Sequence, residues 1–257
     1  MQLANARRYL FLARTFRNGW ELIGSHRQGR PCGRAVLWSG ATLTHPPRQG
    51  GLVGTILELW LDQCYTANGF YEPAAGDVII DAGAHVGLFA CWAARRNPAA
   101  QVVALEPSAD NYQCLRANLA AMGVSNVRAL RLAIGGGNGF GRVEAATDRS
   151  IDHRLVPVPQ HDPAAVPIVS LAGLLELAGT ARVAFLKMDI EGAEHDAFAE
   201  ADRATLDRFD RIALEYHDNL RPGTLALLQA RLEPTHHLTV IPTESRGYGV
   251  LLAARKP

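Results

Sequence analysis

The chain has 257 residues, 48% of them apolar, which is enough to bury a substantial core in one α/β domain with additions. Its 26 Lys and Arg nearly balance its 25 Asp and Glu, so no overall charge attracts nucleic acid or an acidic membrane. The four cysteines are widely spaced without a C-x-x-C pair, and no apolar run reaches the length of a membrane span. We therefore expect a cytoplasmic protein with reduced thiols and a small-molecule partner. We expect no nucleic-acid binding and no integral membrane segment, and leave a homo-oligomer open.

Residues 1–76 predict an extension of helices and short strands that packs on the main domain. Apolar residues recur at three- and four-residue intervals at Leu3, Ala6, Leu10, Ala13 and Phe16. This spacing predicts an amphipathic helix that packs on its own domain or on a second subunit, with a membrane-surface helix as the alternative. Residues 34–61 then indicate short strands broken by Pro and Gly, followed by a helix.

From residue 77 to residue 257 the sequence alternates between strand-like and helix-like stretches. The strand-like runs are 77–81, 101–106, 127–133, 182–189 and 211–216. The helical stretches lie near 87–96, 108–121, 170–178, 192–207 and 222–232. Two further runs, 237–242 and 247–254, predict a C-terminal hairpin. The pattern predicts an α/β fold with a Rossmann-like, doubly wound, mostly parallel sheet and an antiparallel C-terminal hairpin, which binds ligands at the strands' carboxyl ends.

The first strand of this region runs into a turn of small residues, Gly83-Ala84-His85-Val86-Gly87. Gly83 permits a backbone turn that a side chain would block, and Gly87 allows the next helix to approach closely. The N-terminus of that helix offers free N–H groups to an anionic group. Glu106 ends the next strand, where an acid accepts hydrogen bonds from ribose hydroxyls. These features predict an adenosine-type ligand.

The details of the turn distinguish between ligands of that type. Dinucleotide enzymes need a glycine where His85 stands, so that the backbone reaches the pyrophosphate. Asp81, just ahead of the turn, would repel a pyrophosphate but would suit the ammonium and sulfonium groups of S-adenosylmethionine. Both residues favour S-adenosylmethionine over a dinucleotide. The first alternative is an NAD(P)-dependent oxidoreductase, and the second is a nucleotide-binding module without catalysis.

Charged residues gather where two later strands end. Lys187 and Asp189 share one face of their strand, and Glu191 follows directly. In the next strand Glu215 and His217 reach the same edge. A single acid before a helix is an ordinary cap, but this concentration at the ligand-binding edge favours a functional site.

Four segments together resemble one protein family: DVIIDAGAHVG, VVALEPSADNYQCLRANL, FLKMDIEGAE and ALEYH. They are similar to the FkbM family of S-adenosylmethionine-dependent methyltransferases, which have the class I methyltransferase fold and often act on hydroxyl groups of natural products and saccharides. The resemblance runs from about residue 35, with Glu58 and Tyr65 also fitting, to about residue 217. His85 departs from it, since the family more often has Asn there.

The resemblance implies S-adenosylmethionine as the cofactor. Its methionine end would lie against Asp81, Gly83, Ala84 and Gly87, and His85 would also contact the cofactor. Its ribose would lie against Glu106, Pro107 and Ser108. Asp189 would lie near the methionine portion and the transferring methyl group.

Transfer to a hydroxyl requires removal of the hydroxyl proton. His217 has the most suitable ordinary pKa for a base, with Asp189 and Glu191 as alternatives and Lys187 beside them. Oxygen ligands for Mg²⁺ are available at Asp189, Glu215, Asp218 and Asn219. Because the Lys187 cation would repel a divalent ion, we expect a reaction without a metal.

Residues 135–167 are too rich in Gly and Pro for a simple crossover helix. Their position predicts a substrate lid, with a surface loop as the alternative. Asp152, His153 and His161 are the candidates there to meet an acceptor. The sequence thus predicts a methyltransferase domain over 77–257 that O-methylates a hydroxylated small molecule.

Overall fold

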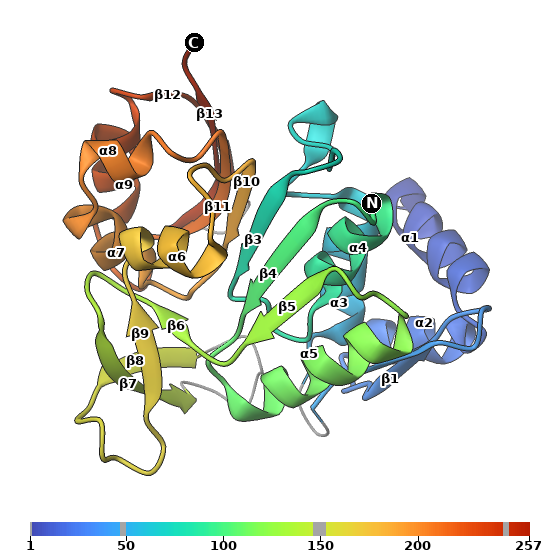
Figure 1. The fold of residues 1–257 in the computed structure, drawn as a ribbon. Helices are drawn as coiled ribbons and strands as arrows, with labels where there is room; N and C mark the ends of the chain where they lie inside the picture. The colour runs from blue at the N-terminus through green and yellow to red at the C-terminus, as the bar shows by residue number, and fades with distance from the viewer. Residues whose placement is uncertain (1, 47–49, 146–152, 244–246) are drawn as a thin grey trace.

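The computed structural model describes residues 2–46, 50–145, 153–243 and 247–257. Its centre is a seven-stranded sheet with helices on both faces (Figure 1). The strand order is β12-β13-β11-β10-β3-β4-β5. The strands are β3 (Val78–Ala82), β4 (Gln101–Leu105), β5 (Val127–Leu130), β10 (Phe185–Met188), β11 (Arg211–His217), β12 (His236–Pro242) and β13 (Tyr248–Arg255).

The strand directions confirm the predicted sheet. β3, β4, β5, β10 and β11 pair in parallel, because helices connect them across the faces of the sheet. β13 pairs antiparallel with both β11 and β12, so it is the inner strand of the C-terminal hairpin and β12 is the edge. All five parallel strands therefore end at one edge, as a doubly wound fold requires.

Apolar residues on both sides of the sheet divide the core in two. Ile79 of β3 packs on one face with α4 (Leu88–Arg96) and α5 (Ala109–Ala121). Ile80 packs on the other face. That face is covered by α6 (Leu171–Ala178), α7 (Glu194–Glu200), α8 (Arg203–Leu206) and α9 (Thr224–Leu232). Continuous apolar strands are what a sheet covered on both faces needs.

The prediction of a single helix over 192–207 is wrong. The backbone is extended at Ala201, and α8 begins after it. The side chain of Asp202 accepts a hydrogen bond from Thr205 N at 2.7 Å and so caps the second helix. A strong N-cap in the middle of a helical pattern was the signal for this break.

The N-terminal extension packs on the main domain through a shared apolar cluster that includes Val86 and Leu88. Its elements are α1 (Gln2–Thr15), α2 (Gly19–Gln28), β1 (Arg34–Val36), β2 (Thr42–Thr44), α3 (Leu52–Ile56), a π-helix η1 (Leu57–Asp62) and a short 3₁₀ helix η2 (Ala67–Gly69). The predicted helix exists, but the predicted apolar stripe is only partly right. Phe16 of that stripe is buried, whereas Leu10 is 51% exposed and Leu12, outside the stripe, is fully buried. Consecutive apolar residues at 10–12 left the buried side undecided.

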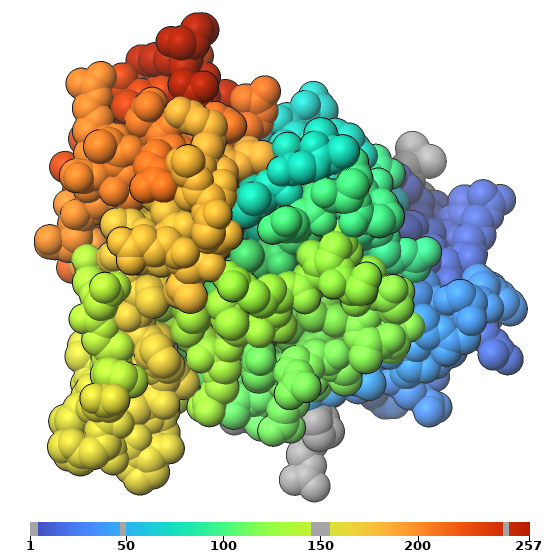
Figure 2. All heavy atoms as spheres, viewed as in Figure 1, coloured from blue at the N-terminus to red at the C-terminus, as the bar shows by residue number. Residues whose placement is uncertain are grey.

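A second sheet of four strands lies beside the main one, in the order β6-β9-β7-β8. It consists of β6 (Ala133–Ile134), β7 (Gly139–Ala145), β8 (His153–Pro157) and β9 (Val166–Val169). The prediction of one strand over 127–133 is wrong, because the chain leaves the main sheet after Leu130 and enters the second sheet at Ala133. Figure 2 shows this second sheet, called the insertion below, as a yellow to yellow-green lobe that projects from the body.

The predicted lid therefore contains regular strands. Of its three candidate residues, Asp152 lies outside the described residues, and only the backbone of His153 is described, at the start of β8. His161 is exposed. None of the described helices has both the length and the apolar content needed to cross a bilayer. The cysteines, all within the described ranges, are free thiols.

Gly87 generates a prediction about stability. It begins α4 with φ of +82°, and a Cβ there would lie 2.3 Å from Cδ1 of Leu115 on α5. Gly87→Ala should lower the free energy of unfolding by about 2–4 kcal/mol, through backbone strain and overpacking together. Urea denaturation measures this. Gly123→Ala is the control, because Gly123 has φ of +64° with open space around it. Equal losses in the two variants would contradict the close packing of α4 on α5.

Candidate functional site

A cavity of about 460 Å³ opens at the carboxyl ends of the parallel strands. Its walls come from the segments that follow β3, β4, β10 and β11. The N-terminal extension adds Glu58 and Tyr65, and the insertion adds Val143 of β7 and Leu155 of β8. Its size and position are typical of a small-molecule site in this kind of fold.

The glycine turn after β3 forms one wall of the cavity. Every second residue from Gly83 to Gly87 adopts a left-handed backbone conformation. Gly83, His85 and Gly87 have φ of +72°, +52° and +82°. A Cβ on Gly83 would lie 1.7 Å from the carbonyl oxygen of Asp189, so the two backbones touch there. The left-handed conformation of His85 favours Asn, Asp and His among residues with side chains. This preference explains how His fits where the resembling family more often has Asn.

Beneath the cavity, Asp81 and Lys187 form a buried ion pair. The two residues are neighbours in the parallel register of β3 and β10. Lys187 Nζ lies 3.3 Å from Asp81 Oδ1 and donates a hydrogen bond to the Gly83 carbonyl at 2.7 Å. Burial raises the pKa of Asp81 and the Lys187 cation partly offsets this, while Asp81 and Asp189 together keep the pKa of Lys187 above its usual value despite burial. Lys187 lines the cavity, and Asp81 lies behind it.

Glu106 ties the glycine turn to the segment after β4. Its Oε2 accepts a hydrogen bond from His85 N at 2.8 Å, and its Oε1 accepts one from Ser108 N at 2.9 Å. Burial raises the pKa of Glu106 to about 7, against the effect of these N–H donors. Glu106 and Pro107 line the cavity, whereas Ser108 contributes its backbone N–H behind it. The side chain of Asn111 also hydrogen-bonds this carboxylate, so three residues hold Glu106 in place at the cavity wall.

Three further carboxylates line the cavity beyond Lys187. The hydroxyl of Tyr65 donates to Asp189 Oδ2 at 3.4 Å or to Glu215 Oε2 at 3.3 Å. Burial and then the charge of Asp189 raise the pKa of Glu191 and of Glu215 to about 8 each. Oδ1 of Asp189 is buried and finds no hydrogen-bond partner among the described residues. A cationic ligand beside these acids would favour their ionised forms.

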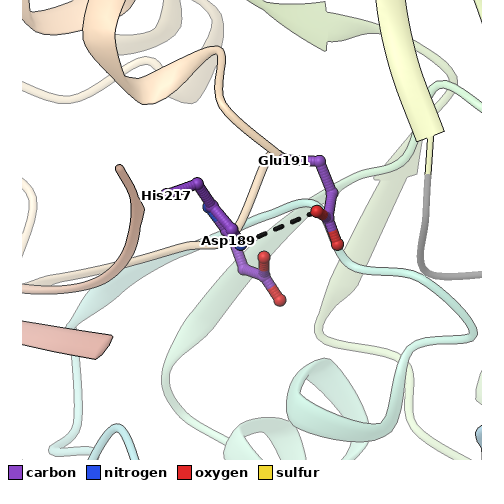
Figure 3. Close-up of side chains that lie close together, drawn as sticks. All are labelled: Asp189, Glu191 and His217. Carbon is purple, nitrogen blue, oxygen red and sulfur yellow. Dashed lines mark ion pairs between the residues drawn. The ribbon is translucent and has the colours of Figure 1, made fainter. Parts of the chain in front are cut away.

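The ring of His217 lies between two of the acids. Its Nδ1 is 3.1 Å from Glu194 Oε1, and its Nε2 is 3.6 Å from Glu191 Oε2, the pair joined in Figure 3. Burial lowers the pKa of His217, but the hydrogen bond to Glu194 and the charges of Glu194, Asp189 and Glu191 outweigh it and raise the pKa to about 10. A pKa raised in this direction favours the protonated imidazole at neutral pH. His217 was chosen as the base because of the ordinary pKa of histidine, and this reason does not hold at a raised pKa.

The structure thus brings together Lys187, Asp189, Glu191 and His217, as their strand positions predict. Reasoning from the sequence missed Glu194, which is fully buried against His217. It ends the family-like segment FLKMDIEGAE, but an acid in the first turn of a helix is usually interpreted as an ordinary helix-stabilising charge. Tyr65 comes from the N-terminal extension. The hydrophobic pattern of the sequence does not show how close this extension lies to the site.

Asp189, Glu191 and His217 each place one potential ligand atom within 4.8 Å of the others. Such a group has the composition of a divalent cation site. The Lys187 cation contributes to the charge around these acids, and His217 already forms an ion pair with Glu191. We therefore do not assign these residues as metal ligands, and the metal-free reaction stays a prediction.

Comparisons with known proteins place the chain among methyltransferases. A family model described as "Methyltransferase FkbM domain" matches residues 81–248. "Methyltransferase 1" of Beauveria bassiana is 27% identical over 197 residues, covering 68% of this chain and 77% of that protein. The "31-O-demethyl-FK506 methyltransferase FkbM" of Streptomyces tacrolimicus is 26% identical over 212 residues, covering 71% of this chain and 80% of that protein. A solved structure titled as a putative rRNA-methylase, from Clostridium thermocellum, shares the fold with a TM-score of 0.52 at 8% identity, over 77% of this chain and 94% of that one.

The buried pair of Asp81 and Lys187 gives a second testable prediction. Lys187→Met should lower the free energy of unfolding at pH 7 by about 3–5 kcal/mol, because it leaves a buried carboxylate without its cation. The loss should shrink at pH 5, since Asp81 in the folded variant takes up a proton more readily than in the unfolded chain. Urea denaturation at both pH values measures it. The double variant Asp81→Asn/Lys187→Met should recover stability, and a double variant no more stable than Lys187→Met would contradict the pairing.

Proposed function

The chain belongs to the FkbM family of S-adenosylmethionine-dependent methyltransferases, and we propose that it transfers the methyl group to a hydroxyl oxygen of a small molecule, either a natural product or a saccharide. The observation that carries this proposal is the partly exposed carboxyl group of Glu191, which lies on the cavity wall with its pKa raised to about 8. The Streptomyces relative, named for 31-O-demethyl-FK506, also supports oxygen as the acceptor atom. The oxidoreductase alternative is not retained, since the family is one of methyltransferases.

The cavity residues fit the cofactor's charges. S-adenosylmethionine supplies an electrophilic methyl group on a positively charged sulfonium. Among the described residues, the cavity wall carries the carboxyl groups of Glu58, Glu106, Asp189, Glu191 and Glu215. Asp189, with its buried and unpartnered oxygen, suits the cationic methionine end, and Glu106 suits the ribose hydroxyls. The backbone of Gly83 and Ala84 provides a wall without bulky side chains.

Glu191 is our choice for the base that accepts the hydroxyl proton. Its side chain is 23% exposed and so is open to an acceptor from the cavity. Glu215, with a similar pKa, lies within hydrogen-bonding distance of Tyr65. The cationic ring of His217, 3.6 Å from Glu191, stabilises the ionised form that receives the proton. Glu191 adopts φ of +53°, a strained conformation of the kind that collects at functional sites.

The insertion completes the acceptor side of the proposed site. Val143 and Leu155, on the paired strands β7 and β8, face the same cavity as Glu191. Their apolar side chains exclude water from the reacting oxygen, which strengthens the electrostatic contacts there. We infer that this second sheet acts as the lid and contributes to acceptor selection.

Glu106 should bind the cofactor without taking part in the chemistry. Glu106→Ala should weaken binding of S-adenosylhomocysteine by about 1.5–3 kcal/mol, the range for hydrogen bonds to a charged group. Isothermal titration calorimetry measures it, with thermal unfolding as the check on folding. Glu72→Ala is the matched control, because Glu72 is an exposed acid paired with Arg96 outside the cavity. Wild-type affinity in Glu106→Ala would remove Glu106 from the cofactor site.

Glu191 should set the pH dependence. Because its pKa is raised and the ionised form is active, kcat/KM should rise as the pH passes through about 8. Glu191→Gln should lower kcat by about 10²–10⁴-fold and remove that rise. Methyl transfer from labelled S-adenosylmethionine to hydroxylated acceptors, assayed with EDTA present, measures both. Glu215→Gln is the comparison: a rise that persists in Glu191→Gln and disappears in Glu215→Gln would move the base to Glu215.

A further inference from the structure

Glu194 joins two parts of the site through a single oxygen atom. It is the first residue of α7 and is fully buried. Its Oε1 accepts a hydrogen bond from the backbone N–H of Ile190 at 3.0 Å and lies 3.1 Å from Nδ1 of His217. The loop that carries Asp189 and Glu191 is thus fastened to the end of β11.

We propose that Glu194 is a positioning residue: it keeps a proton on Nδ1 of His217 and, together with Glu191 on the Nε2 side, favours the doubly protonated ring. The hydrogen bond made by one ring nitrogen of a histidine sets the ring's orientation and decides whether the other nitrogen carries a proton. Here Oε1 of Glu194 already accepts the N–H of Ile190, so it meets the ring as an acceptor and Nδ1 is the donor.

The burial of Glu194 strengthens its interaction with the His217 ring. An ionised carboxylate at full burial is costly unless a cation lies beside it. Oε2 of Glu194 has no hydrogen-bond partner in the described parts of the chain, so His217 and the Ile190 N–H are the groups that compensate its charge. Charge on each member of the pair therefore favours charge on the other.

The remaining groups around His217 act in the same direction. Asp189 and Glu191 face the ring from the loop after β10, and Glu215 interacts with it from its own strand. Tyr248 of β13 is its neighbour in register. Of the acids, Glu194 alone hydrogen-bonds the ring among the described residues. It therefore contributes most directly to the protonated state of His217.

The consequence for catalysis rests on the proposed methyl transfer with Glu191 as the base. A protonated His217 cannot accept the hydroxyl proton, but its charge favours the ionised form of Glu191. Glu194 would then adjust the base from a distance, through a ring it holds in place. The proton state of His217 itself does not depend on that mechanism.

The test is a pH titration of the histidine ring nitrogens by ¹⁵N NMR, with His217→Asn used to identify the His217 signals. Wild-type His217 should stay doubly protonated through neutral pH. Glu194→Gln keeps an oxygen acceptor at the same place but loses the charge, so the midpoint should fall by about 1–3 units. Glu200→Gln, an exposed acid on the same helix, should leave the midpoint unchanged.

Two results would overturn the inference. One is a wild-type His217 whose pKa lies near the ordinary value of about 6.5. This measurement does not require any variant to fold. The other is a folded Glu194→Gln with the wild-type midpoint. In activity assays Glu194→Gln should shift the kcat/KM profile to higher pH, because Glu191 loses a cationic neighbour. A fully active Glu191→Gln together with the expected fall in the His217 midpoint would reject the proposed base and support the role of Glu194.

Discussion

The site depends on the contacts made by the ammonium group of Lys187. It lies 3.3 Å from Asp81 on β3, donates to the carbonyl of Gly83 in the glycine turn, and sits 5.4 Å from the centre of the Tyr65 ring. One buried cation thus joins two strands, the turn between strand and helix, and the N-terminal extension. The acids around the cavity are tolerable in a buried place because this cation and the His217 ring offset their charge.

The sheet itself follows from local sequence. Apolar runs, glycine turns and helical stretches repeat at short range, so the strands β3, β4, β10 and β11 and their common edge were predictable. The adjacency of Asp81 and Lys187 depends on register, which is set between strands far apart in the chain. Errors arose where local patterns allow two answers, as in the buried side of α1 and the strand after residue 127.

The site shows the same division. Residues at strand ends could be named from the sequence, because the fold brings those ends together. The proton state of His217 could not, since it depends on Glu194 and Glu191 at atomic distance. An isolated imidazole has one ordinary pKa, and only the arrangement of three acids around it changes the imidazole from an acceptor to a cation.

The place of β13 in the sheet has a consequence for how the chain assembles. It lies between β11 and β12, although both precede it in the sequence. During synthesis β11 therefore presents an unpaired, apolar edge, and β12 has no neighbour to join, until residues 248–255 have emerged from the ribosome. Tyr248 also lines the cavity, so the pocket closes in the same late step. A nascent chain halted before β13 would carry an incomplete pocket and an edge open to association with other chains.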